Sequence, residues 1–130
     1  MIEYNRIELG KVAKERGFVR DTFEKVLRLK EILRYFNEDE YLREHLVLKG
    51  GTAINMTIFN LPRLSVDIDM DFTPNYSRED TEVARKEITG RLQRYMQEEG
   101  YHLSESSRYS HSLDSFLFQY QNAGGNRDNI

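Results

Sequence analysis

The chain has 130 residues, 38% of them hydrophobic, which is enough to bury one core and predicts a single domain or one piece of a larger protein rather than two domains. Its formal net charge of −3 gives no overall attraction for polyanions, so any contact with nucleic acid is expected to be local. It has no cysteine, which excludes disulfides, thiolate metal sites and cysteine nucleophiles.

The first 44 residues are predicted to be helical. Residues 7–16 carry a weak helical stripe that Gly17 would end. A stronger helix is expected to start at Asp21, three residues before Glu24, in the spacing of a capping box. Apolar residues follow at helical spacing, namely Phe23, Val26, Leu27, Leu33 and Phe36. Residues 38–44 predict another helical turn or two.

The middle of the chain predicts two strands around a short helix. Residues 45–48 form an apolar run that predicts a buried strand, broken by Gly50 and Gly51. Residues 52–59 predict a short helix, and Pro62 closes the connection to a second strand over residues 66–72.

The last third predicts one long helix and further strands. The helix covers residues 77–99 and ends at Gly100, with an apolar face made by Ala84, Ile88, Leu92, Tyr95 and Met96. Strands are expected over residues 101–106 and 115–121, and the latter alternates apolar with polar side chains.

Residues 122–129 are predicted to be turn. Gly124, Gly125 and Asn126 predict a hairpin whose second arm begins near Ile130, where the sequence ends. We therefore expect a domain that is truncated at its C-terminus, with a naturally frayed tail as the alternative.

Three aspartates stand at every second position of the strand predicted over residues 66–72. The strand period puts Asp67, Asp69 and Asp71 on one face, and Val66, Ile68, Met70 and Phe72 on the other. Carboxylates about 7 Å apart repel by about 2 kcal/mol at an effective dielectric near 20, which a divalent cation such as Mg²⁺ would offset. The alternative is an edge strand whose wet acidic face deters pairing.

A Gly-Gly turn follows the first predicted strand and precedes a predicted helix. Such a turn leaves backbone N–H groups at a positive helix end, where phosphate can bind, and Thr52 could cap the helix or meet a phosphate oxygen. A tight strand-to-helix turn without a ligand is the alternative. Only fifteen residues separate Gly51 from Asp67. If the two strands are adjacent, a triphosphate at the turn would lie beside a metal at the aspartates, as nucleotidyl transfer requires.

These two motifs carry a family resemblance. The segment Leu48-Lys49-Gly50-Gly51-Thr52-Ala53, followed by Arg63-Leu64-Ser65-Val66-Asp67-Ile68-Asp69, resembles the AbiEii-type nucleotidyltransferases of the DNA polymerase beta-like superfamily. The resemblance implies that Gly50, Gly51 and Thr52 contact nucleotide phosphates and that Asp67 and Asp69 bind Mg²⁺ or Mn²⁺. It gives Asp71 no role. Members of the superfamily supply a third carboxylate from a later strand, expected here directly after residues 124–129.

Other polar residues are weaker candidates. Lys49, Arg63 and Ser65 flank the motifs and could reach a triphosphate. For Arg63, a surface ion pair is an equally good interpretation. The basic residues of the long helix could touch RNA, but a solvated face is favoured. The scattered histidines, His45, His102 and His111, are not expected to bind zinc or to act in a catalytic triad. No serine lies in the Gly-x-Ser-x-Gly motif of hydrolases.

We therefore predict an α/β (α+β) nucleotidyltransferase fold with a small mixed sheet flanked by helices. Residues 1–44 would form a helical N-terminal part, and residues 45–130 the catalytic-type core. The resemblance implies transfer of a nucleotidyl group from an NTP to an acceptor, with tRNA as a candidate, by a toxin that has a cognate antitoxin. The alternatives are a catalytically incomplete module that binds nucleotide and metal, and an antitoxin-interacting protein. The sequence has no apolar leader or membrane span, so we expect a cytoplasmic protein.

Overall fold

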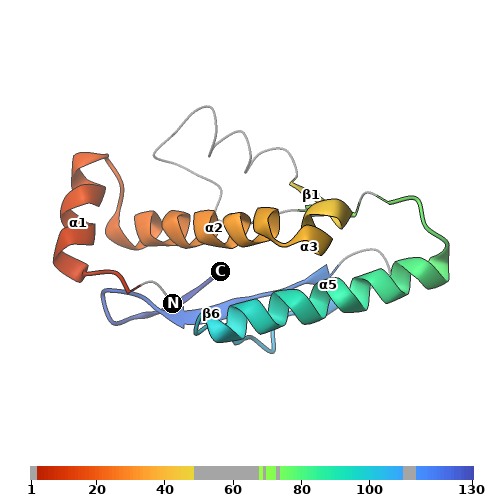
Figure 1. Cartoon of the computed structure of the whole chain (residues 1–130). Coiled ribbons are helices and arrows are strands. Elements are labelled where there is room, and N and C mark those ends of the chain that lie inside the picture. The colour runs from red at the N-terminus through yellow and green to blue at the C-terminus, as the bar shows by residue number, and fades with distance from the viewer. Residues whose placement is uncertain (1–2, 49–67, 69, 73, 110–113) are drawn as a thin grey trace.

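The computed structural model describes residues 3–48, 68, 70–72, 74–109 and 114–130 of the chain. Two long helices, α2 (Arg20–Glu38) and α5 (Arg78–Glu98), run beside each other along the molecule, with strand β6 (Phe118–Gln121) next to α5 (Figure 1). The predicted short helix over residues 52–59 lies outside the described residues. The prediction of mixed helices and strands is confirmed.

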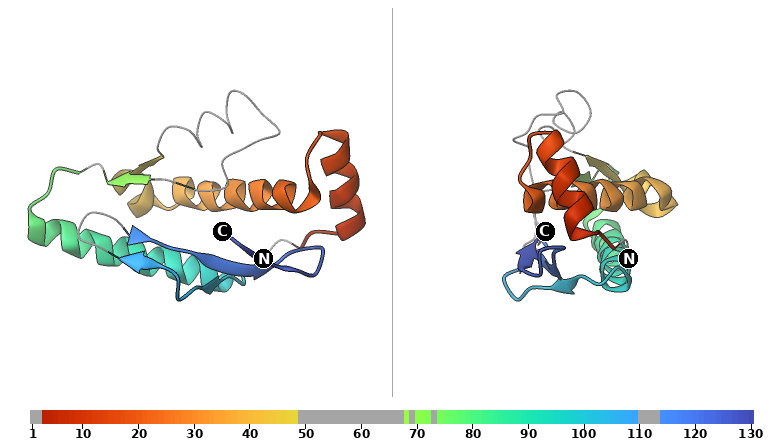
Figure 2. Two further views of the ribbon diagram at one scale, coloured as in Figure 1. Left: turned by 180° about the vertical axis from the view of Figure 1, so that it is seen from behind. Right: turned by 90° about the vertical axis from the view of Figure 1, so that its left-hand side faces the viewer.

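The first helix, α1 (Arg6–Glu15), confirms the helix predicted over residues 7–16. The side chain of Asn5 caps it by accepting hydrogen bonds from the backbone N–H groups of Ile7 and Glu8. Two residues after its end, Gly17 adopts a φ of 78°, which favours glycine. Helix α1 crosses the end of α2 (Figure 2), where its buried residues, Leu9 and Ala13, pack against Phe23.

Helix α2 is confirmed, but the capping box predicted at its start is wrong. The residue that caps it is Val19, whose side chain makes no capping hydrogen bond, and Asp21 lies inside the first turn. The physical reason is that Glu24 is fully buried and forms an ion pair with Arg28, so its carboxylate does not cap the backbone. The apolar face buries Phe23, Leu29, Ile32 and Phe36.

A short helix and a strand follow α2 directly. Helix α3 (Glu40–His45) confirms the helical turns predicted over residues 38–44, and the Asp39 side chain caps it through the Leu42 N–H at 3.0 Å. Strand β1 (Leu46–Leu48) pairs antiparallel with β2 (Met70–Phe72) next to α3 (Figure 2). The prediction of a buried strand is only partly right, because Leu46 is half-buried whereas Val47 is 52% exposed.

Helix α5 confirms the long helix predicted over residues 77–99. The Ser77 side chain caps it through the Asp80 N–H, and Gly100 ends it with a φ of 87°. Its predicted apolar face packs into the main core, which joins α2, α5 and β6. The rings of Tyr35 on α2 and Tyr95 on α5 stack with their centroids 3.9 Å apart, so the two helices are in direct contact.

The C-terminal strands form two small sheets. Strand β6 lies between β3 (His102–Leu103) and β7 (Arg127–Asn129), and β4 (Arg108–Tyr109) pairs with β5 (Asp114–Ser115). Phe118 and Tyr120 are buried, as the predicted alternation requires. Every strand pair among the described residues is antiparallel, where a mixed sheet was expected.

The hairpin predicted at the glycine turn is present between β6 and β7, but its second arm begins earlier than predicted. Gly125 has a φ of 86° and turns the chain, and the second arm begins at Arg127 rather than near Ile130. Residues 127–129 are therefore strand and not turn. Their polar sequence does not predict a strand, because an edge strand pairs through its backbone and needs no alternation of apolar and polar side chains.

The hairpin is fixed to α2 by a buried polar network. The Arg28 guanidinium donates to the Glu24 carboxylate at 2.9 Å and to the Tyr101 hydroxyl at 3.1 Å. Its carbon Cζ lies 4.3 Å from the Tyr120 ring centroid. Glu24 also accepts the backbone N–H of Ala123 at 2.7 Å, so one buried ion pair joins the helix to the turn of the hairpin.

Candidate active site

The two motif-bearing strands are neighbours. In the β1–β2 pair, Leu46 faces Phe72, Val47 faces Asp71 and Leu48 faces Met70. Lys49 directly follows Leu48, and Asp69 directly precedes Met70, so the Gly-Gly motif and the acidic motif join the pair at the same end. The predicted adjacency of the two strands is confirmed. The predicted site residues themselves lie outside the described residues, namely Lys49, Gly50, Gly51, Thr52, Arg63, Ser65, Asp67 and Asp69.

In the described part of the acidic segment, side chains that face the core alternate with an exposed one, as in a strand that has one face on the core. Ile68 and Met70 pack against the main core, and Phe72 is half-buried. Asp71 is exposed on the opposite face. The predicted two-faced character of this segment is thus confirmed for residues 68 and 70–72.

Four aromatic side chains surround the opposite end of the strand pair. His45 is 8% exposed, and its Nδ1 lies 2.7 Å from the Tyr41 carbonyl oxygen. Its Nε2 lies 3.3 Å from the Tyr76 hydroxyl, and its ring stacks on Tyr41 with the centroids 4.0 Å apart. Phe72 completes this aromatic cluster, with its ring edge-to-face against Tyr76 at 5.8 Å.

Sequence reasoning treated His45 as ordinary, and no spacing could have revealed this arrangement. Its neighbour Tyr76 is 31 residues away and follows a different strand. The only sequence signal was the position of His45, immediately before the strand that leads into the glycine motif.

A second set of polar contacts holds the aromatic cluster against α5. The Arg91 guanidinium lies over the Tyr41 ring, 5.0 Å from its centroid, and donates to the Asp39 carboxylate at 3.0 Å. Burial acts to raise the pKa of Asp39, but the Leu42 N–H and the Arg91 guanidinium outweigh burial and lower this pKa. Asp39 is therefore held as a carboxylate that joins the start of α3 to α5.

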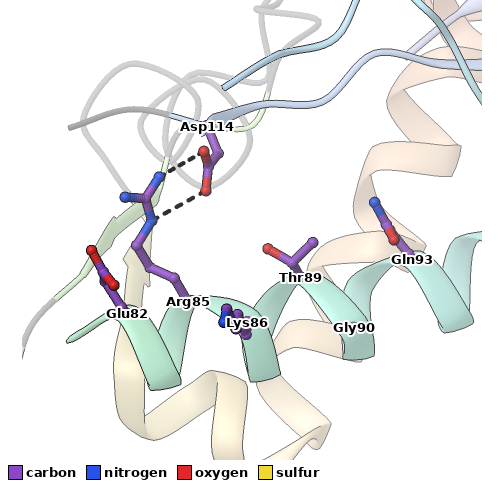
Figure 3. A pocket seen from close by; sticks show the side chains of 7 residues that line it. All are labelled: Glu82, Arg85, Lys86, Thr89, Gly90, Gln93 and Asp114. Atoms are coloured by element: carbon purple, nitrogen blue, oxygen red, sulfur yellow. Dashed lines mark hydrogen bonds and ion pairs between the residues drawn. The ribbon is translucent and has the colours of Figure 1, made fainter. Parts of the chain in front are cut away.

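A polar hollow of about 420 Å³ lies along α5, and none of its described lining residues belongs to β1 or β2. Figure 3 shows the Arg85 guanidinium directed at Asp114, with both hydrogen bonds drawn, and the shorter of these is 2.7 Å. The charged residues that line the hollow are Glu82, Arg85, Lys86 and Asp114, whose charges cancel. The described lining residues therefore give the hollow no net positive charge with which to attract a triphosphate.

The comparisons with known proteins agree with the motifs. The model of the AbiEii family, described as nucleotidyl transferase AbiEii toxin of a type IV toxin-antitoxin system, matches residues 31–129. The chain belongs to this family. No curated protein and no solved structure matches the chain. The resemblance stated from the two motifs is therefore confirmed, and the family is one of nucleotidyltransferase toxins.

The AbiEii match begins inside α2, at residue 31, and extends almost to the last residue. It includes both motifs, the aromatic cluster and the β6–β7 hairpin. Helix α1 and the first turns of α2 lie before it, so the Arg28–Glu24 pair belongs to the part of this chain that the AbiEii match does not cover.

Strand β7 precedes the place where the resemblance implies a third carboxylate, which is expected directly after residues 124–129. It carries Asp128, whose carboxylate pairs with the Lys25 ammonium at 3.1 Å and accepts from the Tyr120 hydroxyl at 3.5 Å. Asp128 is thus part of the contact between the hairpin and α2. Among the described residues, no group of three or more histidine, aspartate or glutamate side chains could hold a metal ion.

No helix in the described part of this AbiEii chain is both long enough and apolar enough to cross a membrane.

Proposed function

We propose that this AbiEii-family chain catalyses the Mg²⁺-dependent transfer of a nucleotidyl group from an NTP to an RNA acceptor, for which tRNA is the candidate. Family membership supports the transferase class. One structural observation supports the location of the site. It is the antiparallel register of β1 and β2, in which the residue before Lys49 faces the residue after Asp69.

The triphosphate would bind at the glycine turn. The backbone N–H groups of Gly50 and Gly51 and the hydroxyl of Thr52 are suitable donors for phosphate oxygens, because glycine lets the backbone approach a ligand closely. Lys49, Arg63 and Ser65 flank the two motifs and would add donors to the phosphate oxygens.

The aspartates would hold the metal. Asp67 and Asp69 provide carboxylate oxygens, which are the hard ligands that Mg²⁺ and Mn²⁺ prefer, so the donor set fits such an ion. If the alternation seen at Met70, Asp71 and Phe72 continues, Asp69 and Asp67 share the face of Asp71. When bound, the ion would neutralise charge on the phosphates of the NTP. The contribution of the protein is to hold the triphosphate and the acceptor in line.

A cognate antitoxin is the expected counterpart of the chain, because the family description is that of a toxin in a toxin-antitoxin system. We propose a cytoplasmic location for both, since an NTP and tRNA are available there.

Label transfer tests the proposal. The chain is incubated with each of the four α-labelled NTPs, Mg²⁺ and total tRNA, and the RNA is separated on a denaturing gel. We expect label on RNA from at least one NTP, and its loss in the Asp67→Asn/Asp69→Asn variant. Far-ultraviolet circular dichroism controls for folding of the variant.

Absence of transfer from all four NTPs would contradict the catalytic proposal. If Mg²⁺-dependent NTP binding persisted in that case, the chain would be a module that binds nucleotide and metal without turnover.

A further inference from the structure

We propose that His45 and Tyr76 are positioning residues, which hold β1 and β2 in the register that brings the glycine turn and the acidic strand together. The proposal deepens the proposed function and rests on it for its effect on nucleotide binding. It starts from the aromatic cluster defined above, Tyr41, His45, Phe72 and Tyr76, which lies at the end of the strand pair opposite the two motifs.

The hydrogen bond to Tyr41 defines which nitrogen of the neutral His45 ring carries the proton. The Tyr41 carbonyl can only accept, so the Nδ1–H of His45 must donate to it across the 2.7 Å distance. In the neutral ring the other nitrogen, Nε2, then carries a lone pair. The Tyr76 hydroxyl, 3.3 Å away, donates to that lone pair.

The second of these hydrogen bonds joins the entry of β1 to the exit of β2, whereas the first lies within α3. His45 is the last residue of α3 and immediately precedes Leu46, the first residue of β1. Tyr76 lies between β2 and α5, four residues after Phe72, which faces Leu46. The hydrogen bond between His45 and Tyr76 therefore closes the base of the strand pair.

A strand pair with few paired residues is stabilised by such a closure. Three residues of each strand are described, and two-stranded pairs are marginally stable without further contacts. A slip of one residue would move every side chain of β2 to the other face, including Asp71. Because Asp69 precedes Met70 directly, the same slip would change which residues of the acidic motif approach Lys49. The closure at the base thus sets the spacing of the two motifs.

The test uses a matched pair of tyrosine variants. Tyr76→Phe removes only the hydroxyl that donates to His45 and keeps the ring that contacts Phe72. Tyr41→Phe is the control, because it keeps both the carbonyl that accepts from His45 and the ring that stacks on it. Two measurements are made on each variant, namely amide hydrogen exchange in β1 and β2 by NMR and the Kd of NTP with Mg²⁺.

For Tyr76→Phe we expect exchange of the β1 and β2 amides to accelerate by about threefold to tenfold, the effect of losing one hydrogen bond. We expect the Kd to rise by a similar factor. Exchange in α5, which is not part of the strand pair, is expected to stay at the wild-type rate, and Tyr41→Phe is expected to match the wild type in both measurements.

Two substitutions of His45 distinguish a hydrogen-bonding role of its Nε2 from a role in packing alone. The His45→Gln side chain reaches the position of Nε2 and can accept from Tyr76, whereas the His45→Asn side chain reaches only the position of Nδ1. We expect His45→Gln to keep more of the nucleotide affinity than His45→Asn. Equal loss in both variants would overturn the proposal.

The exchange measurement separates this proposal from the proposed function. Wild-type exchange rates in Tyr76→Phe would overturn the closure, whether or not the chain binds NTP. Faster exchange with an unchanged Kd would overturn the positioning role. Failure of the wild-type chain to bind any NTP would instead count against the proposed function, and the exchange rates would still decide whether the closure exists.

Discussion

Leu48 faces Met70 across the β1–β2 pair, one residue before Lys49 on the first strand and one residue after Asp69 on the second. This register joins two motifs that are separated by fifteen residues in the sequence. An antiparallel pair is sufficient for this, because the end of one strand lies beside the start of its neighbour. The described pairing of β1 and β2 is thus sufficient to bring the ends of the two motif-bearing segments to one end of the pair.

Two glycines in and after α5 are expected to respond oppositely to alanine. Gly100 has a φ of 87°, so Gly100→Ala should lower the free energy of unfolding by about 1–2 kcal/mol. Gly90 lies inside the same helix, and an added Cβ there meets no atom within 4 Å. Gly90→Ala should raise the free energy of unfolding by about 1 kcal/mol. Urea unfolding followed by circular dichroism measures both, and effects of the same sign would contradict the account.

The buried Arg28–Glu24 pair is expected to be costly to break from one side. Arg28→Met leaves the fully buried Glu24 carboxylate without the cation that it pairs with and should lower the free energy of unfolding by about 3 kcal/mol. Glu24→Gln/Arg28→Met removes both charges and keeps an oxygen that can accept from the Ala123 N–H. The double variant should therefore be more stable than Arg28→Met alone.

Arg34→Met is the matched control for the buried pair. Like Arg28, Arg34 pairs with a glutamate one helical turn away, here Glu38, but its side chain is 67% exposed. Its loss should leave the free energy of unfolding close to that of the wild type, because solvent screens an exposed ion pair. Equal costs for Arg28→Met and Arg34→Met in urea unfolding would show that burial does not determine the effect.

Asp39 should make stability depend on pH in the acid range. Its pKa is lowered in the folded chain, so its contribution is present above the unfolded pKa of about 4 and is lost as the pH falls through the folded pKa. Asp39→Asn keeps an oxygen that can accept from the Leu42 N–H and removes the charge that pairs with Arg91. The stability difference between wild type and Asp39→Asn should therefore be largest at pH 6 and shrink by pH 3. A difference that stays constant over this range would rule out the charge as its cause.

Much of this fold could be predicted from sequence patterns that act locally. Helices α1 and α5 are ended by glycines at positive φ, and the apolar face of α5 packs as its periodicity predicts. The Asp-x-Asp and Gly-Gly motifs identified the family because both depend on fixed spacing in a short segment.

The errors arose where distant residues determine the local outcome. The capping box failed because Glu24 pairs with Arg28 in a core that also contains Tyr101, 73 residues beyond Arg28. The second arm of the hairpin was missed because β7 pairs through its backbone against β6. The closure by His45 and Tyr76 depends on the pairing of β1 and β2, which no single segment encodes.

The most direct test of the central claim is calorimetric binding of the four NTPs to the chain with Mg²⁺, compared with the Asp67→Asn/Asp69→Asn variant. We predict Mg²⁺-dependent binding of at least one NTP by the wild type, NMR shift changes at Gly50, Gly51 and Thr52, and loss of binding in the variant. Binding that the double variant retains, or no binding of any NTP at millimolar concentration, would contradict the claim that the two motifs form one nucleotide site.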